Sequence, residues 1–110
     1  MKKESKLQSA CVRWFRYAFP NDLIFAIPNG GSRNKLEAVN LKNEGVLAGV
    51  ADLQVISKNK TLFIEMKTEK GRQNPNQKIF EERVRKLGFD YFVCRSFDEF
   101  QKVIVSNIVK

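Results

Sequence analysis

The stretch GVADLQVISKNKTLFIEMK, residues 49–67, holds two apolar, β-branched runs on either side of a short polar break. Asn59 in that break tolerates a positive φ, so the stretch predicts two antiparallel strands joined by a tight turn. A two-residue or four-residue loop would be symmetric about the point between Lys58 and Asn59. Asp52 then lies directly opposite Glu65, with their Cβ atoms about 5 Å apart.

Strand alternation divides the side chains of this hairpin between two faces. The apolar face is expected to be core and comprises Ala51, Leu53, Val55, Leu62, Ile64 and Met66. The other face comprises Asp52, Phe63, Glu65 and Lys67. Two facing carboxylates repel each other unless positive charge lies between them, and Mg²⁺ takes carboxylate, water and phosphate oxygens. The acids are therefore candidate metal ligands; a surface salt bridge to Lys67 is the alternative.

Asp52 followed by Glu65-Met66-Lys67 resembles the signature of PD-(D/E)XK nucleases. More of the chain is similar to one branch of that superfamily, the VRR-NUC domain of virus-type replication and repair nucleases. The similarity extends over nearly all 110 residues and includes Glu4 and Gln8 on an early helix, Pro28-Asn29-Gly30-Gly31, Gly49-Val50-Ala51-Asp52-Leu53, Ile64-Glu65-Met66-Lys67, and Gln77 opening a later helix. Ala51 stands where the superfamily signature has proline, and alanine is compatible with a strand.

The resemblance implies a single nuclease domain over residues 1–110, with a restriction-endonuclease-like α/β sandwich. It implies a DNA endonuclease that uses Mg²⁺ or Mn²⁺, held by Asp52, Glu65 and the backbone carbonyl of Met66. Lys67 would contact the attacking water or a phosphate oxygen. Stand-alone domains of this size look like Holliday-junction resolvases, so a homodimer acting on branched or flapped DNA is expected. The alternative is a non-catalytic nucleic-acid-binding or protein-docking module on the same fold.

Composition favours a polyanionic partner, because 20 basic residues against 12 acidic ones give a formal charge of +8. A basic protein without such a partner is the alternative. The chain has no histidine, which excludes histidine-based zinc sites and Ser-His or Cys-His nucleophile pairs. Any hydrolysis must therefore use carboxylates, lysine and metal. No apolar run reaches the length of a membrane span, so we expect a cytoplasmic protein of a bacterial host, with a phage origin in keeping with its size.

Apolar residues at helical spacing predict an amphipathic helix over residues 4–18. Glu4 and Gln8 lie one turn apart beside its apolar stripe. From the residues alone, Glu4 is a first-turn acid that the helix dipole favours. The resemblance instead places Glu4 in the site, where it would bind a metal through water or bind a second metal. Gln8 is equally a nucleic-acid contact or an ordinary surface residue.

Residues 29–34 form a turn rich in glycine and side-chain amides. They follow a predicted buried strand over residues 23–27, which Pro28 ends. The turn lacks the spacing of a phosphate-binding P-loop. A plain connection is one interpretation. The other, which the resemblance favours, is contact of Asn29, Arg33 and Asn34 with the nucleic-acid backbone.

Residues 68–75 form a polar segment next to the candidate site. Lys70 and Arg72 in it are candidates to clamp nucleic acid, although a solvated charge run is the alternative. Asn74 and Gln77 are spaced as N-cap and N3 of the next helix, which gives Gln77 a structural role. The resemblance adds a second interpretation, in which Gln77 belongs to the neighbourhood of the site.

The remaining pattern completes an α/β sandwich around a mixed four-stranded sheet. The other predicted elements are a helix over about 34–43, a helix opened by Asn74-Pro75 with Phe80, Val84 and Leu87 inward, a buried strand over 91–94, and a last helix capped by Ser96. The strand over 91–94 is expected to run parallel to the strand over 61–67, because a helix connects them.

Overall fold

The computed structural model describes residues 2–28 and 35–108. Its elements are α1 (Lys3–Ala18), β1 (Leu23–Ala26), α2 (Lys35–Asn43), β2 (Leu53–Ser57), β3 (Lys60–Met66), α3 (Pro75–Lys86), β4 (Asp90–Cys94) and α4 (Phe97–Asn107). This order of helices and strands is the predicted one. The α/β fold class is confirmed.

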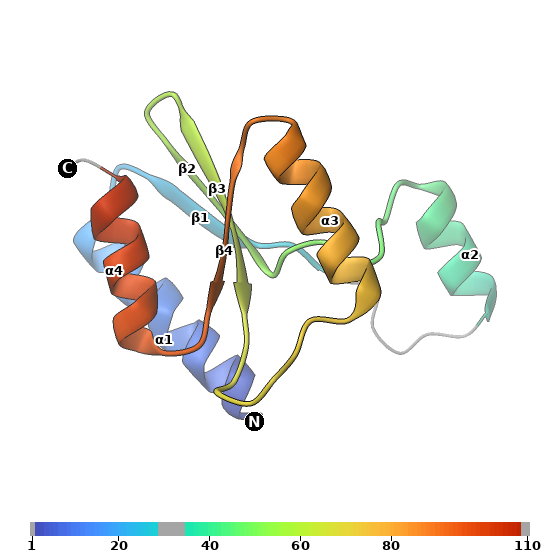
Figure 1. The fold of residues 1–110 in the computed structure, drawn as a ribbon, viewed down its shortest axis with the longest axis horizontal. Coiled ribbons are helices and arrows are strands. Elements are labelled where there is room, and N and C mark those ends of the chain that lie inside the picture. The colour runs from blue at the N-terminus through green and yellow to red at the C-terminus, as the bar shows by residue number, and fades with distance from the viewer. Residues whose placement is uncertain (1, 29–34, 109–110) are drawn as a thin grey trace.

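The four strands form one sheet in the order β1-β2-β3-β4. β1 and β3 both pair antiparallel with β2, and β4 pairs parallel with β3. The parallel pair is the one connected through α3, as expected, because parallel neighbours need a long crossover. The mixed four-stranded sheet that the sequence predicts is thus present (Figure 1).

The hairpin between β2 and β3 has a two-residue turn, since Ser57 pairs with Lys60. Asn59 in this turn has a φ of 59°, the left-handed conformation that asparagine tolerates better than most residues. The pairing continues to Leu53 and Ile64 at the other end of the ladder. The predicted symmetric register is therefore confirmed.

One face of the sheet is covered by α1 and α4, which together bury the larger apolar cluster (Figure 1). The strands contribute the predicted core side chains Leu53, Val55, Leu62, Ile64 and Met66, all fully buried. Cys11 and Phe15 come from α1, and Phe100 and Ile104 come from α4. This packing explains the helical spacing of apolar residues at both ends of the chain.

The other face of the sheet is covered by α3 and buries a smaller cluster. Its buried members are Ala51, Val84 and Tyr91, with Phe63, Phe80 and Val93 packed against them. The assignment of Ala51 to the same face as Leu53 was wrong. β2 begins only at Leu53, so strict two-residue alternation does not extend back to Ala51.

Two further apolar predictions were wrong. The strand over residues 23–27 was expected to be buried, but in β1 only Ile24 is buried, because β1 is an edge strand covered on one face. Leu87 was expected in the core stripe of α3, but it is 74% exposed. α3 ends at Lys86, and Leu87 is its C-cap, where the helical periodicity no longer holds.

Gly49 allows the chain before β2 to pass very close to α3. Its φ is +83°, and a Cβ placed on it would lie 2.3 Å from the backbone oxygen of Asn76. Only glycine fits both this conformation and this distance. The backbone that approaches Gly49 this closely is the first turn of α3.

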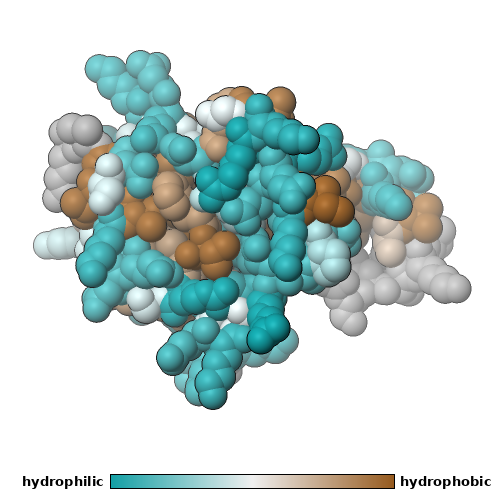
Figure 2. Space-filling view, viewed as in Figure 1, coloured by the Kyte–Doolittle hydropathy of each residue, from teal (hydrophilic) through white to brown (hydrophobic). Residues whose placement is uncertain are grey.

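The face of the molecule shown in Figure 2 is mostly hydrophilic, with smaller hydrophobic areas between the polar side chains. Among the described residues, none of the helices has the length and apolar character needed to cross a membrane.

Candidate active site

Asp52 lies immediately before β2, one step beyond the last ladder pair, Leu53 with Ile64. Its backbone carbonyl accepts a hydrogen bond of 2.8 Å from the amide of Ile27. Its side-chain Oδ2 accepts another, of 2.7 Å, from the amide of Met66. The Asp52 side chain thus accepts a hydrogen bond at the position where the β2–β3 backbone ladder would otherwise continue. This bond holds the carboxylate beside the end of β3.

Glu65 on β3 is a buried acid, with only 1% of the residue exposed. Its Oε1 accepts hydrogen bonds from the Tyr91 hydroxyl and, at 3.2 Å, from Nε2 of Gln73. Its Oε2 is buried and has no hydrogen-bond partner among the described residues. Lys67 Nζ lies 3.6 Å from Oε2. A buried carboxylate oxygen without a hydrogen bond is unfavourable, so Oε2 is available to a positively charged ligand.

Negative charge accumulates at this end of the sheet. Burial is the main cause of the raised pKa of Asp52, and the hydrogen bond from the Met66 amide opposes it. Repulsion from Glu4 and Glu65 raises this pKa further, while Lys67 lowers it. Carboxylates that are partly desolvated and close to one another are the environment that a bound cation stabilises.

Lys67 directly follows β3. Its amide donates a 3.0 Å hydrogen bond to the carbonyl of Cys94, so the parallel pairing with β4 continues one residue beyond the strand. Its side chain is only 13% exposed and lies on the same face as Glu65. The structure therefore brings Asp52, Glu65 and Lys67 together at one end of the sheet.

The family model described as the VRR-NUC domain matches residues 2–98. The chain belongs to the VRR-NUC family. Two solved structures, a "VRR_NUC domain protein" and a "VRR_NUC domain", are each 25% identical to it in sequence. The first has a TM-score of 0.77 and the alignment covers 98% of this chain and 89% of the other. The second has a TM-score of 0.71, with 98% and 100% covered. A comparison with curated proteins gives no match.

Membership in the VRR-NUC family makes this chain a member of a nuclease family, for which DNA is the implied substrate.

In this VRR-NUC domain, Glu4 lies in the first turn of α1, half-buried and close enough to act on Asp52. No three histidine, cysteine or acidic residues gather as a metal-ligand group within the described ranges. Glu4 thus adds negative charge without completing a set of three carboxylates with Asp52 and Glu65. Gln8 lies one turn further along α1, and no hydrogen bond joins it to the described site.

Gln77 of the VRR-NUC domain forms the predicted capping box at the start of α3. Its amide donates to Oδ1 of Asn74 at 2.9 Å, and its Oε1 accepts from the amide of Asn74 at 2.8 Å. The structural role of Gln77 is therefore present. Gln73, four residues earlier, is the glutamine that bonds to Glu65, and neither Gln73 nor Tyr91 was among the predicted site residues.

The structure describes some of the residues predicted to contact nucleic acid and not others. Asn29, Arg33 and Asn34 lie outside the described residues. Lys70 and Arg72 are exposed, on the segment that joins β3 to α3. Arg95 fastens this segment by donating to the carbonyls of Thr68, Glu69 and Gly71. The two basic side chains therefore project from a segment whose backbone is held beside Lys67.

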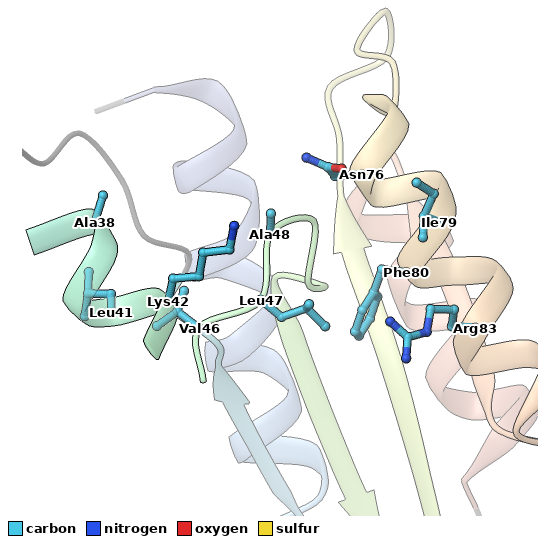
Figure 3. Close-up of a pocket in the computed structure, with 10 residues that line it drawn as sticks. All are labelled: Ala38, Leu41, Lys42, Val46, Leu47, Ala48, Asn76, Ile79, Phe80 and Arg83. Atoms are coloured by element: carbon cyan, nitrogen blue, oxygen red, sulfur yellow. The ribbon is translucent and has the colours of Figure 1, made fainter. Parts of the chain in front are cut away.

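An apolar groove of the VRR-NUC domain lies away from the carboxylates, between α2 and α3 (Figure 3). It is lined by Ala38, Leu41, Lys42, Val46, Leu47, Ala48, Asn76, Ile79, Phe80 and Arg83. Among the described residues, no Cα of α2 lies within 8 Å of a Cα in another helix or strand. α2 thus stands apart from the sandwich (Figure 1), with the groove between it and α3.

Proposed function

We propose that this VRR-NUC domain is a metal-dependent, structure-selective DNA endonuclease that hydrolyses phosphodiester bonds. The observation that carries the proposal is Oε2 of Glu65, a buried carboxylate oxygen with no hydrogen-bond partner among the described residues. It lies 3.6 Å from Lys67 Nζ, in a site that also holds the partly desolvated Asp52. A purely structural ion pair at this depth is often no more stable than apolar side chains of similar size, which favours a functional reason for these charges.

Mg²⁺ or Mn²⁺ suits the available donors, since hard divalent ions bind oxygen. The proposed ligands are Asp52, Glu65 through Oε2, and the Met66 carbonyl. The N–H and C=O of one strand residue face the same neighbouring strand, and the Met66 N–H donates to Asp52. The Met66 carbonyl therefore faces the Asp52 side. When bound, such an ion orients water and neutralises charge on the phosphate under attack. Glu4 would act on this ion through water or bind a second one.

Lys67 stabilises negative charge in the proposed reaction. The carboxylate of Glu65 holds its ammonium in place at 3.6 Å, so the charge is positioned before substrate arrives. Donation from this ammonium to a phosphate oxygen or to the attacking water stabilises negative charge as it develops in the transition state. The effect is strengthened by the limited exposure of the side chain, 13%, because a partly dry site screens charge less than water does.

DNA is the proposed substrate, and the phosphate backbone is the part that most of these residues would contact. The formal charge of +8 favours a polyanion, and Lys70 and Arg72 lie exposed on the segment that follows Lys67. Their contacts carry no sequence information, in keeping with selectivity for DNA structure. Binding is therefore expected to weaken steeply as salt rises.

A homodimer is the proposed assembly, with Holliday junctions among the branched or flapped substrates. The groove between α2 and α3 supports it, because Leu47 and Ile79 line this groove and are 48% and 53% exposed. Sedimentation of the wild type should show a dimer that Leu47→Glu weakens. Val105→Glu is the control, at a position on α4 that is 65% exposed. A monomer even at high protein concentration counts against both the dimer and junction resolution.

The experiment that tests the proposed function is a gel assay of end-labelled four-way junction, flap and linear duplex, with Mg²⁺, Mn²⁺ or chelator. Wild type is compared with Lys67→Ala, and Lys60→Ala is the control at the other end of the same strand. We expect metal-dependent cleavage that Lys67→Ala reduces by about 100-fold or more and Lys60→Ala leaves nearly unchanged. Binding without cleavage on every substrate and with every metal would instead indicate a non-catalytic nucleic-acid-binding or protein-docking module on the same fold.

A further inference from the structure

The two oxygens of the Glu65 carboxylate have very different surroundings. Oε1 accepts two hydrogen bonds, from the hydroxyl of Tyr91 on β4 and from the amide of Gln73. Oε2 accepts none among the described residues and faces Lys67. The carboxylate cannot rotate to exchange its oxygens without breaking both bonds to Oε1. The protein thus distinguishes one oxygen of this acid from the other.

The Gln73 amide is itself fixed in orientation. Its Nε2 donates to Glu65 Oε1 at 3.2 Å and to Glu81 Oε1 at 2.9 Å. Both partners are carboxylates, so the side-chain NH₂ group and not the carbonyl must face them. Arg85 on α3 in turn holds Glu81 through its Nε at 3.0 Å and the Tyr91 carbonyl through its Nη2 at 2.8 Å.

These bonds close a ring from Glu65 through Tyr91, Arg85, Glu81 and Gln73 back to Glu65. The ring joins β3, β4, α3 and the segment before α3. Each member restrains the next, so Oε1 of Glu65 is held by a network that spans the α3 side of the sheet. A network in which every member is bonded is rigid and specifies one arrangement.

We propose that Gln73 and Tyr91 are positioning residues that occupy Oε1 of Glu65 and leave Oε2 as its single metal ligand, which favours Mg²⁺ or Mn²⁺ over Ca²⁺. This inference rests on the proposed metal-dependent function. Ca²⁺ accepts bidentate carboxylates at about 2.3–2.6 Å, whereas Mg²⁺ requires a nearly octahedral arrangement at about 2.0–2.1 Å. A glutamate that offers one oxygen suits the octahedral arrangement of Mg²⁺. It cannot bind Ca²⁺ through both oxygens.

Calorimetric titration of the chain with MnCl₂ and with CaCl₂, without DNA, tests the proposal independently of activity. The variants are Tyr91→Phe, which keeps the buried ring, and Gln73→Leu, on the segment before α3. Loss of a hydrogen-bonded group behind a metal ligand typically weakens binding by about 10- to 100-fold. We expect a loss of that order for Mn²⁺ in each variant and a smaller loss, or a gain, for Ca²⁺. Tyr17→Phe, at a tyrosine that is 88% exposed, and Gln101→Leu on α4 are the matched controls.

The outcomes separate this inference from the proposed function. Unchanged Mn²⁺ affinity and unchanged preference over Ca²⁺ in both variants would overturn the positioning role while leaving the metal site intact. Failure of the wild type to bind either ion would overturn the metal-dependent function itself, and the positioning role with it. If Tyr91→Phe does not fold, as circular dichroism would show, Gln73→Leu alone decides.

Discussion

β3 carries an ion pair near each of its ends, and the two pairs are almost equal in length. Lys67 Nζ lies 3.6 Å from Glu65, and Lys60 Nζ lies 3.7 Å from Asp90. The side chains of the first pair are 13% and 1% exposed, and those of the second are 38% and 48% exposed. Water screens the second pair, so its expected contribution is about 0–1 kcal/mol. The two ion pairs thus differ in burial and not in length. The buried pair, Lys67 with Glu65, marks the end of β3 that is suited to chemistry, and the exposed pair lies at the turn.

The two ends also differ in how tightly the surrounding backbone packs. Gly49, near the site, has a φ of +83°, and Gly88, near the turn, has a φ of +89°. An added Cβ would meet the Asn76 backbone oxygen at 2.3 Å in the first case and nothing within 4 Å in the second. Gly49→Ala should lower the free energy of unfolding by about 3 kcal/mol or more, as strain and overlap combine. Gly88→Ala should lower it by only about 1–2 kcal/mol, from strain alone.

Urea denaturation of both variants measures this difference. Because the two glycines have nearly the same φ, their difference isolates the contact between residue 49 and the start of α3. Equal losses of stability would mean that α3 moves away at little cost. The close contact between residue 49 and the start of α3 would then contribute nothing to the free energy of unfolding.

The ion pairs provide the second test, through Lys67→Met and Lys60→Met in chelator. Lys67→Met leaves Glu65 buried with an uncompensated charge, and we expect a loss of about 2 kcal/mol in the free energy of unfolding. Lys60→Met leaves an exposed Asp90 that water solvates, and the loss should be below about 0.5 kcal/mol. Methionine keeps most of the length of the lysine side chain, so packing changes little. A loss for Lys60→Met as large as for Lys67→Met would contradict the role assigned to burial.

The hairpin and the facing acids could be predicted from sequence because a local feature determines them. A symmetric two-residue turn at Lys58 and Asn59 fixes the register of β2 and β3, and that register places Asp52 beside Glu65. The misassigned residues, Ala51 and Leu87, lie just outside the ends of elements. Periodicity there no longer describes which face a side chain occupies.

Tyr91 and Gln73 could not be predicted, because their contacts depend on how distant segments meet. Tyr91 is buried in the edge strand β4 and is indistinguishable in sequence from a core aromatic residue. It reaches Glu65 because β4 pairs with β3 in the register that places Tyr91 opposite Phe63. No turn sets that register, since α3 intervenes. Gln73 reaches Glu65 only because the segment after β3 folds back and is fastened by Arg95.

The smallest expected effect is the most specific to the proposed metal site. It compares Asp52, at the site end of the sheet, with Asp90, at the end where β2 turns into β3. Bound metal stabilises the folded state by RT ln(1 + [L]/Kd), which is about 1.4 kcal/mol at ten times Kd. Mn²⁺ at that concentration should raise the free energy of unfolding of Asp90→Ala by this amount, as in the wild type, because Asp90 lies at the turn end. Asp52→Ala should show no such increase. Its metal-free form should lose little stability. The lost hydrogen bond with the Met66 amide and the lost attraction of Lys67 are offset because the carboxylate is no longer buried and no longer repelled by Glu4 and Glu65. An equal increase in both variants would mean that Mn²⁺ binds elsewhere, and the two ends of β3 would then differ in burial without differing in function.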